Sequence, residues 1–119
     1  MKKGIDITKA RWAQKTYSEF FSEEGTFAGK TISNVVSDLK SGAIKPKNVP
    51  IDVIVRNGVT FILNTRSFIA LTRAGITRNK WTIINRTGNL EYELRLTNQL
   101  KRNNLTNGTM EIRSSGGGN

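Results

Sequence analysis

The chain contains no histidine and no cysteine, and only two of its 119 residues are proline. The missing histidine removes the commonest general base and the commonest zinc ligand. The missing cysteine removes disulfides and thiolate metal sites, and leaves the redox compartment undetermined. No apolar run approaches the roughly 20 residues that span a bilayer, and Met1-Lys2-Lys3 is not followed by a signal-like stretch. A soluble domain without a membrane anchor is therefore expected, carried elsewhere only by something outside this sequence.

Acidic residues are missing from one long stretch. Between Val53 and Leu90 there is no Asp or Glu, yet the stretch carries six basic side chains in a chain of net charge +10. The same stretch shows the pattern of a hairpin followed by a helix, so these charges lie on a folded scaffold. Fixed positive charges suit phosphate groups, which favours nucleic acid as the partner over a merely soluble basic surface. The six residues are Arg56, Arg66, Arg73, Arg78, Lys80 and Arg86.

The length fits one compact domain, expected over residues 1–113, with a flexible tail at 114–119. The predicted class is α+β, with a mixed twisted sheet of about five strands and two or three helices. Apolar spacing predicts a helix at 32–41, and a cap followed by an apolar face predicts another at 66–74. Strands are predicted at 51–56 and 59–63 around an Asn57-Gly58 turn, at 81–85, at 90–96 by alternation, and at 110–112.

The first 24 residues have two interpretations. Asp6-Ile7-Thr8 could cap a helix with Ala10, Ala13 and Tyr17 on one face. Alternatively, Arg11–Gln14 is a short strand followed by a turn rich in Thr and Ser. The sequence does not decide between them.

The most informative motif lies where a predicted strand ends and a helix begins. Asn64 and Thr65 offer a cap, and backbone N–H groups at a helix N-terminus favour anions. Arg66 and Arg73 are seven residues apart, so they are expected near one face of the same helix. Cap, helix dipole and two arginines together predict a phosphate site.

This region resembles the ParB/sulfiredoxin-type domain. The resemblance rests on the helix at 32–41, the Pro50–Val55 strand, the hairpin, Asn64-Thr65-Arg66-Ser67 and Arg73-Ala74-Gly75. In that pattern a glycine usually stands at the position of Asn64 and a second arginine at that of Ser67. Because this chain departs at both positions, that family's nucleotide chemistry is not carried over.

A closer resemblance is to the C-terminal domains of bacterial polymorphic toxins. It covers about residues 10–86 and includes Arg11, Trp12 and Gln14, the helix over 32–39 and the Asn-Thr-Arg-Ser core. The chain looks most like contact-dependent growth inhibition toxins that cut tRNA. The resemblance implies secretion within a larger cell-surface toxin, action in the cytoplasm of target bacteria and an immunity protein, expected to be acidic. It also implies elongation factor Tu as a partner, since that factor activates some of these toxins.

Metal-independent RNA cleavage without histidine must depend on arginine and on a tuned Lys, Tyr, Asp or Glu. No metal and no cofactor is expected. The arginines would clamp the phosphate, while neighbouring polar groups would donate hydrogen bonds to it. The candidate catalytic residues are Arg66, Thr65, Asn64, Ser67, Arg73 and Lys15, and the candidate substrate-binding residues are Arg78, Lys80, Arg86, Gln14 and Tyr17.

Other interpretations remain open. The runner-up function is a non-catalytic ParB-like nucleic-acid-binding module, and a third is a basic protein that engages only an acidic protein. A metal-dependent nuclease would need clustered carboxylates, for which only Asp52, Glu91 and Glu93 could converge. Trp12 and Trp81 could stack on bases, but core packing is the favoured role for both.

Overall fold

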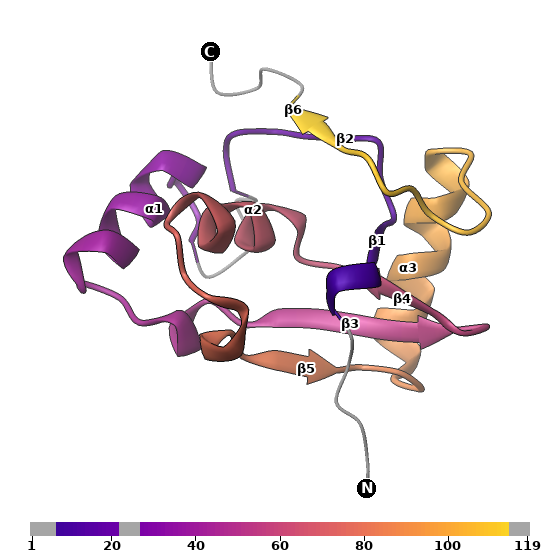
Figure 1. Cartoon of the computed structure of the whole chain (residues 1–119). Helices are drawn as coiled ribbons and strands as arrows, with labels where there is room; N and C mark the ends of the chain where they lie inside the picture. Colours follow the sequence, from indigo (N-terminus) through magenta and orange to yellow (C-terminus); the bar gives the residue numbers. More distant parts are fainter. Residues whose placement is uncertain (1–6, 22–26, 115–119) are drawn as a thin grey trace, which may run out of the picture.

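The strands form one mixed sheet and a separate two-stranded ribbon (Figure 1). The computed structural model describes residues 7–21 and 27–114. In the main sheet the order is β1-β4-β3-β5, with β3 and β4 antiparallel and the outer strands parallel to their neighbours. The predicted α+β class with a mixed sheet is therefore confirmed. The strands are β1 (Arg11–Trp12), β2 (Thr16–Tyr17), β3 (Ile51–Arg56), β4 (Val59–Ile62), β5 (Ile83–Asn85) and β6 (Arg113–Ser114), the ribbon being β2 with β6.

The β3–β4 hairpin turns at Asn57 and Gly58, as predicted. Their φ angles are 53° and 77°, and a type I′ turn needs positive φ at both central positions. The turn fixes the register, which places Arg56 opposite Val59.

Two helices lie within one residue of their predicted bounds. Helix α1 is Ile32–Ser41, and helix α2 is Thr65–Arg73. Helix α1 ends because Gly42, at φ 82°, adopts the left-handed conformation and returns its N–H to the carbonyl of Leu39. These two helices pack against each other.

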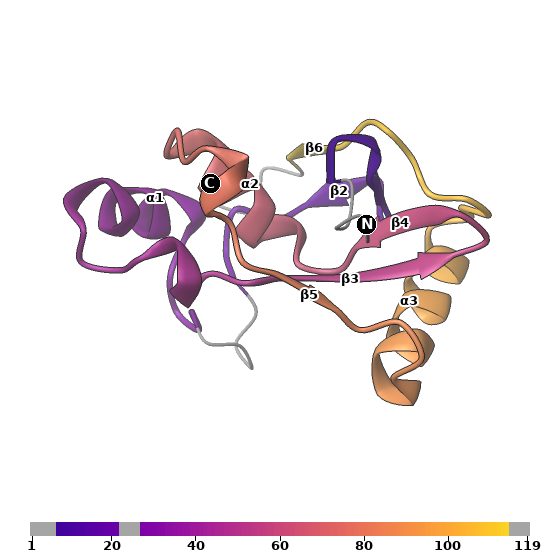
Figure 2. The same cartoon turned by 60° about the horizontal axis from the view of Figure 1, so that its bottom comes forward.

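The sheet has a hydrophobic core on each face. Successive side chains of a strand point to opposite faces, so Val53 joins the core shared with α1 and α2, whereas Ile54 joins the core that contains Leu96 and Leu100. Figure 2 shows α2 and the third helix, α3 (Leu90–Arg102), on opposite sides of β3. The chain therefore has to pass around the sheet between α2 and α3.

The predicted strand at 90–96 is wrong, because this segment is the start of α3. Asn89 caps it through hydrogen bonds from the backbone N–H groups of Glu91 and Tyr92. Leu96 and Leu100 are buried one turn apart, while Leu90 and Leu94 are 85% and 61% exposed. The alternation of apolar and polar residues was a coincidence within a helical pattern that continues beyond residue 96.

Other boundaries differ from the predictions. At the N-terminus the strand interpretation is confirmed and the helix interpretation is wrong, since in the described residues from Ile7 to Phe21 the chain forms a 3₁₀ turn, Ile7–Lys9, and then β1 and β2. The strand predicted at 81–85 is shortened to β5. The strand predicted at 110–112 is absent, and β6 begins directly after that segment. Ser114, assigned to the tail, belongs to β6, and residues 115–119 lie outside the described part of the chain.

Candidate phosphate-binding cleft

A cleft of about 780 Å³ lies where the first turn of α2 meets α3. Its floor includes Asp52 of β3 and Leu63, which follows β4. Residues 64–67 form one wall, and α3 forms another. The cleft therefore gathers segments that are far apart in the sequence around the start of one helix.

The first turn of α2 presents unsatisfied backbone donors. Asn64 occupies the N-cap position, but its side chain makes no capping hydrogen bond. Instead, its amide oxygen accepts a hydrogen bond from the backbone N–H of Asp52. The first backbone N–H groups of a helix have no intrahelical partner and carry partial positive charge. This end of α2 is therefore suited to an anion. Asn64 is at the N-cap position, as predicted, but its side chain does not form the capping hydrogen bond.

Two hydroxyl-bearing residues with little exposed surface lie on the same turn. Thr65 is 5% exposed and Ser67 is 8% exposed, and both line the cleft. Within residues 7–21 and 27–114, neither side chain has a hydrogen-bond partner. A hydroxyl can both donate and accept a hydrogen bond, so these two groups are available to a ligand in the cleft.

Two guanidinium groups, from Arg66 on α2 and Arg95 on α3, line the cleft. Among the described residues neither has a carboxylate partner, and the only hydrogen bond of Arg95 is a long one, 3.5 Å, to the carbonyl of Leu63. Burial lowers the pKa of Arg66, and the charge of Arg95 lowers it further. Two neighbouring cations without an anion between them form a strong site for a phosphate group.

A third arginine is held in a fixed position at the cleft. Arg86 Nε donates to Asp52 Oδ1 at 2.8 Å, and the guanidinium lies 4.7 Å from the ring centroid of Tyr92. The hydrogen bond to Asp52 raises the pKa of Arg86. Because its charge is balanced by Asp52, Arg86 contributes shape and hydrogen bonding more than net charge.

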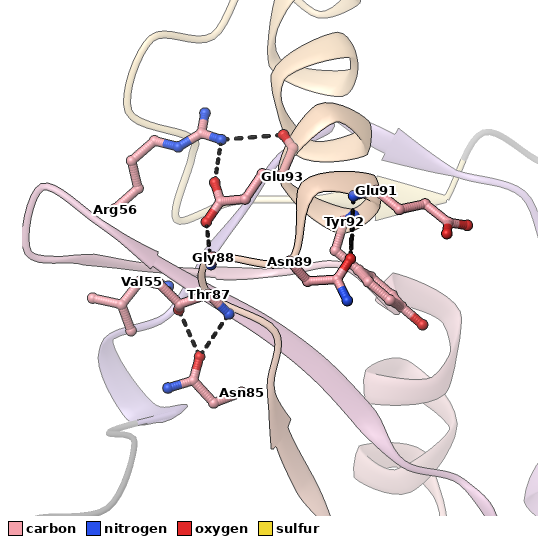
Figure 3. A network of polar contacts seen from close by, with 9 residues as sticks. All are labelled: Val55, Arg56, Asn85, Thr87, Gly88, Asn89, Glu91, Tyr92 and Glu93. Carbon is pink, nitrogen blue, oxygen red and sulfur yellow. Dashed lines mark hydrogen bonds and ion pairs between the residues drawn. The ribbon is translucent and has the colours of Figure 1, made fainter.

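Glu91 supplies the second carboxylate of the cleft. Its backbone N–H is held by Asn89, whereas no side chain in the described segments pairs with its carboxylate. Figure 3 shows Glu91 and Glu93 pointing to different sides of the first turn of α3, with Glu93 bound to Arg56 at 2.7 Å and to the N–H of Gly88. Asp52, Glu91 and Glu93 therefore do not converge on one metal site, because Glu93 is bound to Arg56 and Gly88 outside the cleft.

A pair of glutamines closes one end of the cleft. Gln99 Nε2 donates to Gln14 Oε1 at 3.1 Å, and Gln14 Nε2 donates to the carbonyl of Thr16 at 2.7 Å. Gln99 Oε1 is buried and has no hydrogen-bond partner among the described residues. A buried acceptor without a donor is costly, but this oxygen has almost no accessible surface, so a ligand in the cleft does not contact it.

Five candidates from the sequence lie outside the cleft lining. Arg73 donates to Glu19 at 3.0 Å and to the Tyr17 hydroxyl at 3.0 Å, and the contact with Glu19 raises its pKa. Arg78 lies 5.0 Å from the ring centroid of Phe68 and 4.9 Å from that of Trp81. Those that do not line the cleft are Arg73, Tyr17, Arg78, Lys15 and Lys80, whereas Asn64, Thr65, Arg66, Ser67, Arg86 and Gln14 do.

The stretch from Val53 to Leu90 contains no Asp or Glu, but in the folded structure carboxylates from elsewhere in the chain balance part of its positive charge. Carboxylates from outside this stretch pair with Arg56, Arg73 and Arg86. The predicted partnership of Arg66 with Arg73 is replaced by that of Arg66 with Arg95. The favoured core role of the two tryptophans is confirmed, since both are 8% exposed and pack edge-on against Phe68.

The α3 wall was missed by the sequence reasoning. Glu91, Arg95 and Gln99 are spaced four residues apart, which places them on one helical face. That spacing was visible in the sequence, but the strand predicted at 90–96 ended before Gln99 and so left Gln99 out of the set.

The described part of the chain holds no cluster of three or more acidic side chains placed to bind a metal ion. Among the helices in residues 7–21 and 27–114, none is long and apolar enough to cross a membrane. Searches against protein-family models, curated proteins and solved structures found no match for this chain.

Proposed function

We propose that this chain is a metal-independent ribonuclease that cleaves tRNA in the cleft between α2 and α3. The observation that carries the proposal is the pair Arg66 and Arg95, without carboxylate partners in the described structure, in the same cleft as the side chains of Thr65 and Ser67. Phosphodiester cleavage passes through a pentavalent phosphate with added negative charge. Fixed cations and hydrogen-bond donors stabilise that charge most effectively in a partly dehydrated site.

The proposed chemistry itself selects RNA over DNA. Its attacking group is the ribose 2′-hydroxyl, which deoxyribose lacks. The net charge of +10 adds a general attraction for the phosphate backbone.

Glu91 is the general base that accepts the first proton transferred in the reaction. Its carboxylate takes the proton of the ribose 2′-hydroxyl, and the 2′-oxygen attacks phosphorus. The bond from phosphorus to the 5′-oxygen then breaks, and water protonates the leaving oxygen. The products are a 2′,3′-cyclic phosphate and a 5′-hydroxyl. Asp52 is less suited to this role because Arg86 holds its carboxylate.

The partners follow from the resemblance to contact-dependent toxins and from charge. An acidic immunity protein that covers the cleft would exclude RNA by bulk and by electrostatics. Elongation factor Tu would present the 3′ end of tRNA to a domain too small to select it alone. The site of action would be the cytoplasm of a target bacterium, after delivery within a larger secreted toxin.

Incubation of the protein with total tRNA in EDTA, with and without cell extract, tests the proposal. Discrete fragments that end in 2′,3′-cyclic phosphate are expected. Binding without fragments in either reaction would overturn it and favour the non-catalytic nucleic-acid-binding module. Parallel reactions of purified protein and tRNA, with and without purified elongation factor Tu and GTP, test that partner. Full cleavage activity without the factor would show that the factor is not required.

A further inference from the structure

Two phenylalanines form a wall of the cleft that the phosphate chemistry does not use. Phe21 and Phe27 both line the cleft, with ring centroids 5.2 Å apart and planes tilted by 59°. Both rings are half-buried and pack on one side against the core that contains α1. Their backbones are held by Lys30, whose carbonyl accepts from Phe21 and whose N–H donates to Phe27. The wall is therefore anchored from behind and presents aromatic surface to the cleft.

The aromatic wall and the α3 wall come from different segments of the chain. The segment with Phe21 pairs with the start of α1, where the N–H of Ile32 donates to the carbonyl of Glu19. Figure 1 shows α2 between α1 and α3. The first turn of α2 therefore shares one cleft with an aromatic side and a polar side.

The size of the cleft also exceeds what a phosphate needs. Its volume of about 780 Å³ is within the range of pockets that enclose a drug-sized organic molecule. A nucleotide has a matching division, since its base is flat and apolar on both faces and its phosphate is anionic. Aromatic side chains stack on bases only where those bases are unpaired and turned out of a helix.

We propose that the cleft takes one unpaired nucleotide, with its phosphate on Arg66 and Arg95 and its base stacked on the wall formed by Phe21 and Phe27. This inference rests on the proposed ribonuclease function and narrows its substrate to single-stranded positions, such as a loop or a free end. A base within a duplex remains stacked on its neighbours and does not reach the wall.

The direct test uses the unaltered protein and two uncleavable ligands of equal charge. One is a single-stranded 2′-deoxy tetranucleotide, and the other is the same backbone without bases. We expect the ligand with bases to bind about tenfold or more tightly, since stacking on an aromatic side chain contributes roughly 1–3 kcal/mol per base. Equal affinities would overturn the inference. Inorganic pyrophosphate, measured in parallel, tests the phosphate side separately: failure of pyrophosphate to bind contradicts the proposed function, whereas equal affinities of the two tetranucleotides contradict only the base site.

Substitutions then locate the site. Phe21→Leu and Phe27→Leu should each reduce the affinity for the tetranucleotide several-fold and leave pyrophosphate binding unchanged. Phe20→Leu is the matched control, because Phe20 is 46% exposed and is not part of the cleft lining. Unchanged tetranucleotide affinity in both cleft variants, or an equal loss in the control, would overturn the assignment to this wall.

Discussion

Arg66 on α2 and Arg95 on α3 bring two guanidinium groups to one cleft with no carboxylate between them in the described structure. The pKa of Arg66 is lowered, first by burial and then by the charge of Arg95. A lowered pKa means that the folded protein holds this charge at a cost in free energy. Functional sites commonly retain such costs, because the same groups stabilise a bound ligand or a transition state.

Removal of one of these charges should not destabilise the fold. We expect Arg66→Gln to raise the free energy of unfolding by about 0.5–1 kcal/mol in the absence of ligand. Urea denaturation measures the free energy of unfolding of this variant. Arg102→Gln is the control, because it removes a positive charge and keeps both Arg66 and Arg95. A loss of stability in the Arg66 variant would mean that Arg66 serves the fold.

The salt dependence of RNA binding should separate the cleft arginines from the paired ones. Each phosphate contact contributes about 0.7 to the slope of log affinity against log salt for a single strand. Arg66→Ala and Arg95→Ala should each reduce the slope by about this amount. Arg73→Ala should leave it nearly unchanged, because Glu19 balances that charge. Equal slopes in all three variants would place the phosphate contacts elsewhere.

The helical nature of residues 90–102 predicts a contrast between two leucines. Leu96 is fully buried, so Leu96→Ala should lower the free energy of unfolding by about 2–5 kcal/mol. Leu94 is 61% exposed, and Leu94→Ala should change the free energy of unfolding by less than about 0.5 kcal/mol. Had the segment been a strand with both leucines on its buried face, the two costs would be similar. Chemical denaturation of the two variants distinguishes these outcomes.

Acid should weaken the contact between Glu93 and Arg56. The hydrogen bond from Arg56 and a second from the backbone of Gly88 lower the pKa of Glu93 below 4.5. The carboxylate of Glu93 therefore binds a proton less readily in the folded state than in the unfolded state. The stabilisation is complete above pH 4.5 and is lost as pH falls below that value through the folded pKa.

The measurement is the melting temperature of Glu93→Gln against the unaltered protein across this range. We expect the variant to melt a few degrees lower at pH 7, and the difference to shrink toward pH 3. Arg56→Gln should show the same convergence. A difference that does not vary with pH would contradict the ion pair.

Local signals predicted most of the elements around α2 but not the cleft itself. Asn57-Gly58 fixed the hairpin and Gly42 ended α1 because positive φ is a property of single residues. The partner of Arg66 could not be obtained this way, since Arg95 reaches it only when α3 packs on the opposite face of the sheet. The pairing of Arg73 with Glu19 is likewise a tertiary contact across 54 residues.

The alternation of apolar and charged residues at 90–96 predicted a strand because a segment this short fits both the two-residue period of a strand and the period of a helix. Leu96 and Leu100 follow the helical period, and only the continuation to Leu100 distinguishes it from a strand. The i, i+4, i+8 spacing of Glu91, Arg95 and Gln99 was the one available signal for the missing wall.

The most direct test of the central claim compares cleavage with binding in one variant. In EDTA, Arg66→Ala should reduce the single-turnover rate of tRNA cleavage by about a hundredfold or more, since it removes charge stabilisation of the transition state. Its affinity for tRNA should fall far less. Lys101→Ala, an exposed control on α3 that does not line the cleft, should weaken binding slightly and leave the rate unchanged. Equal effects of the two substitutions on rate would contradict the account, because Arg66 would then lie outside the reacting site.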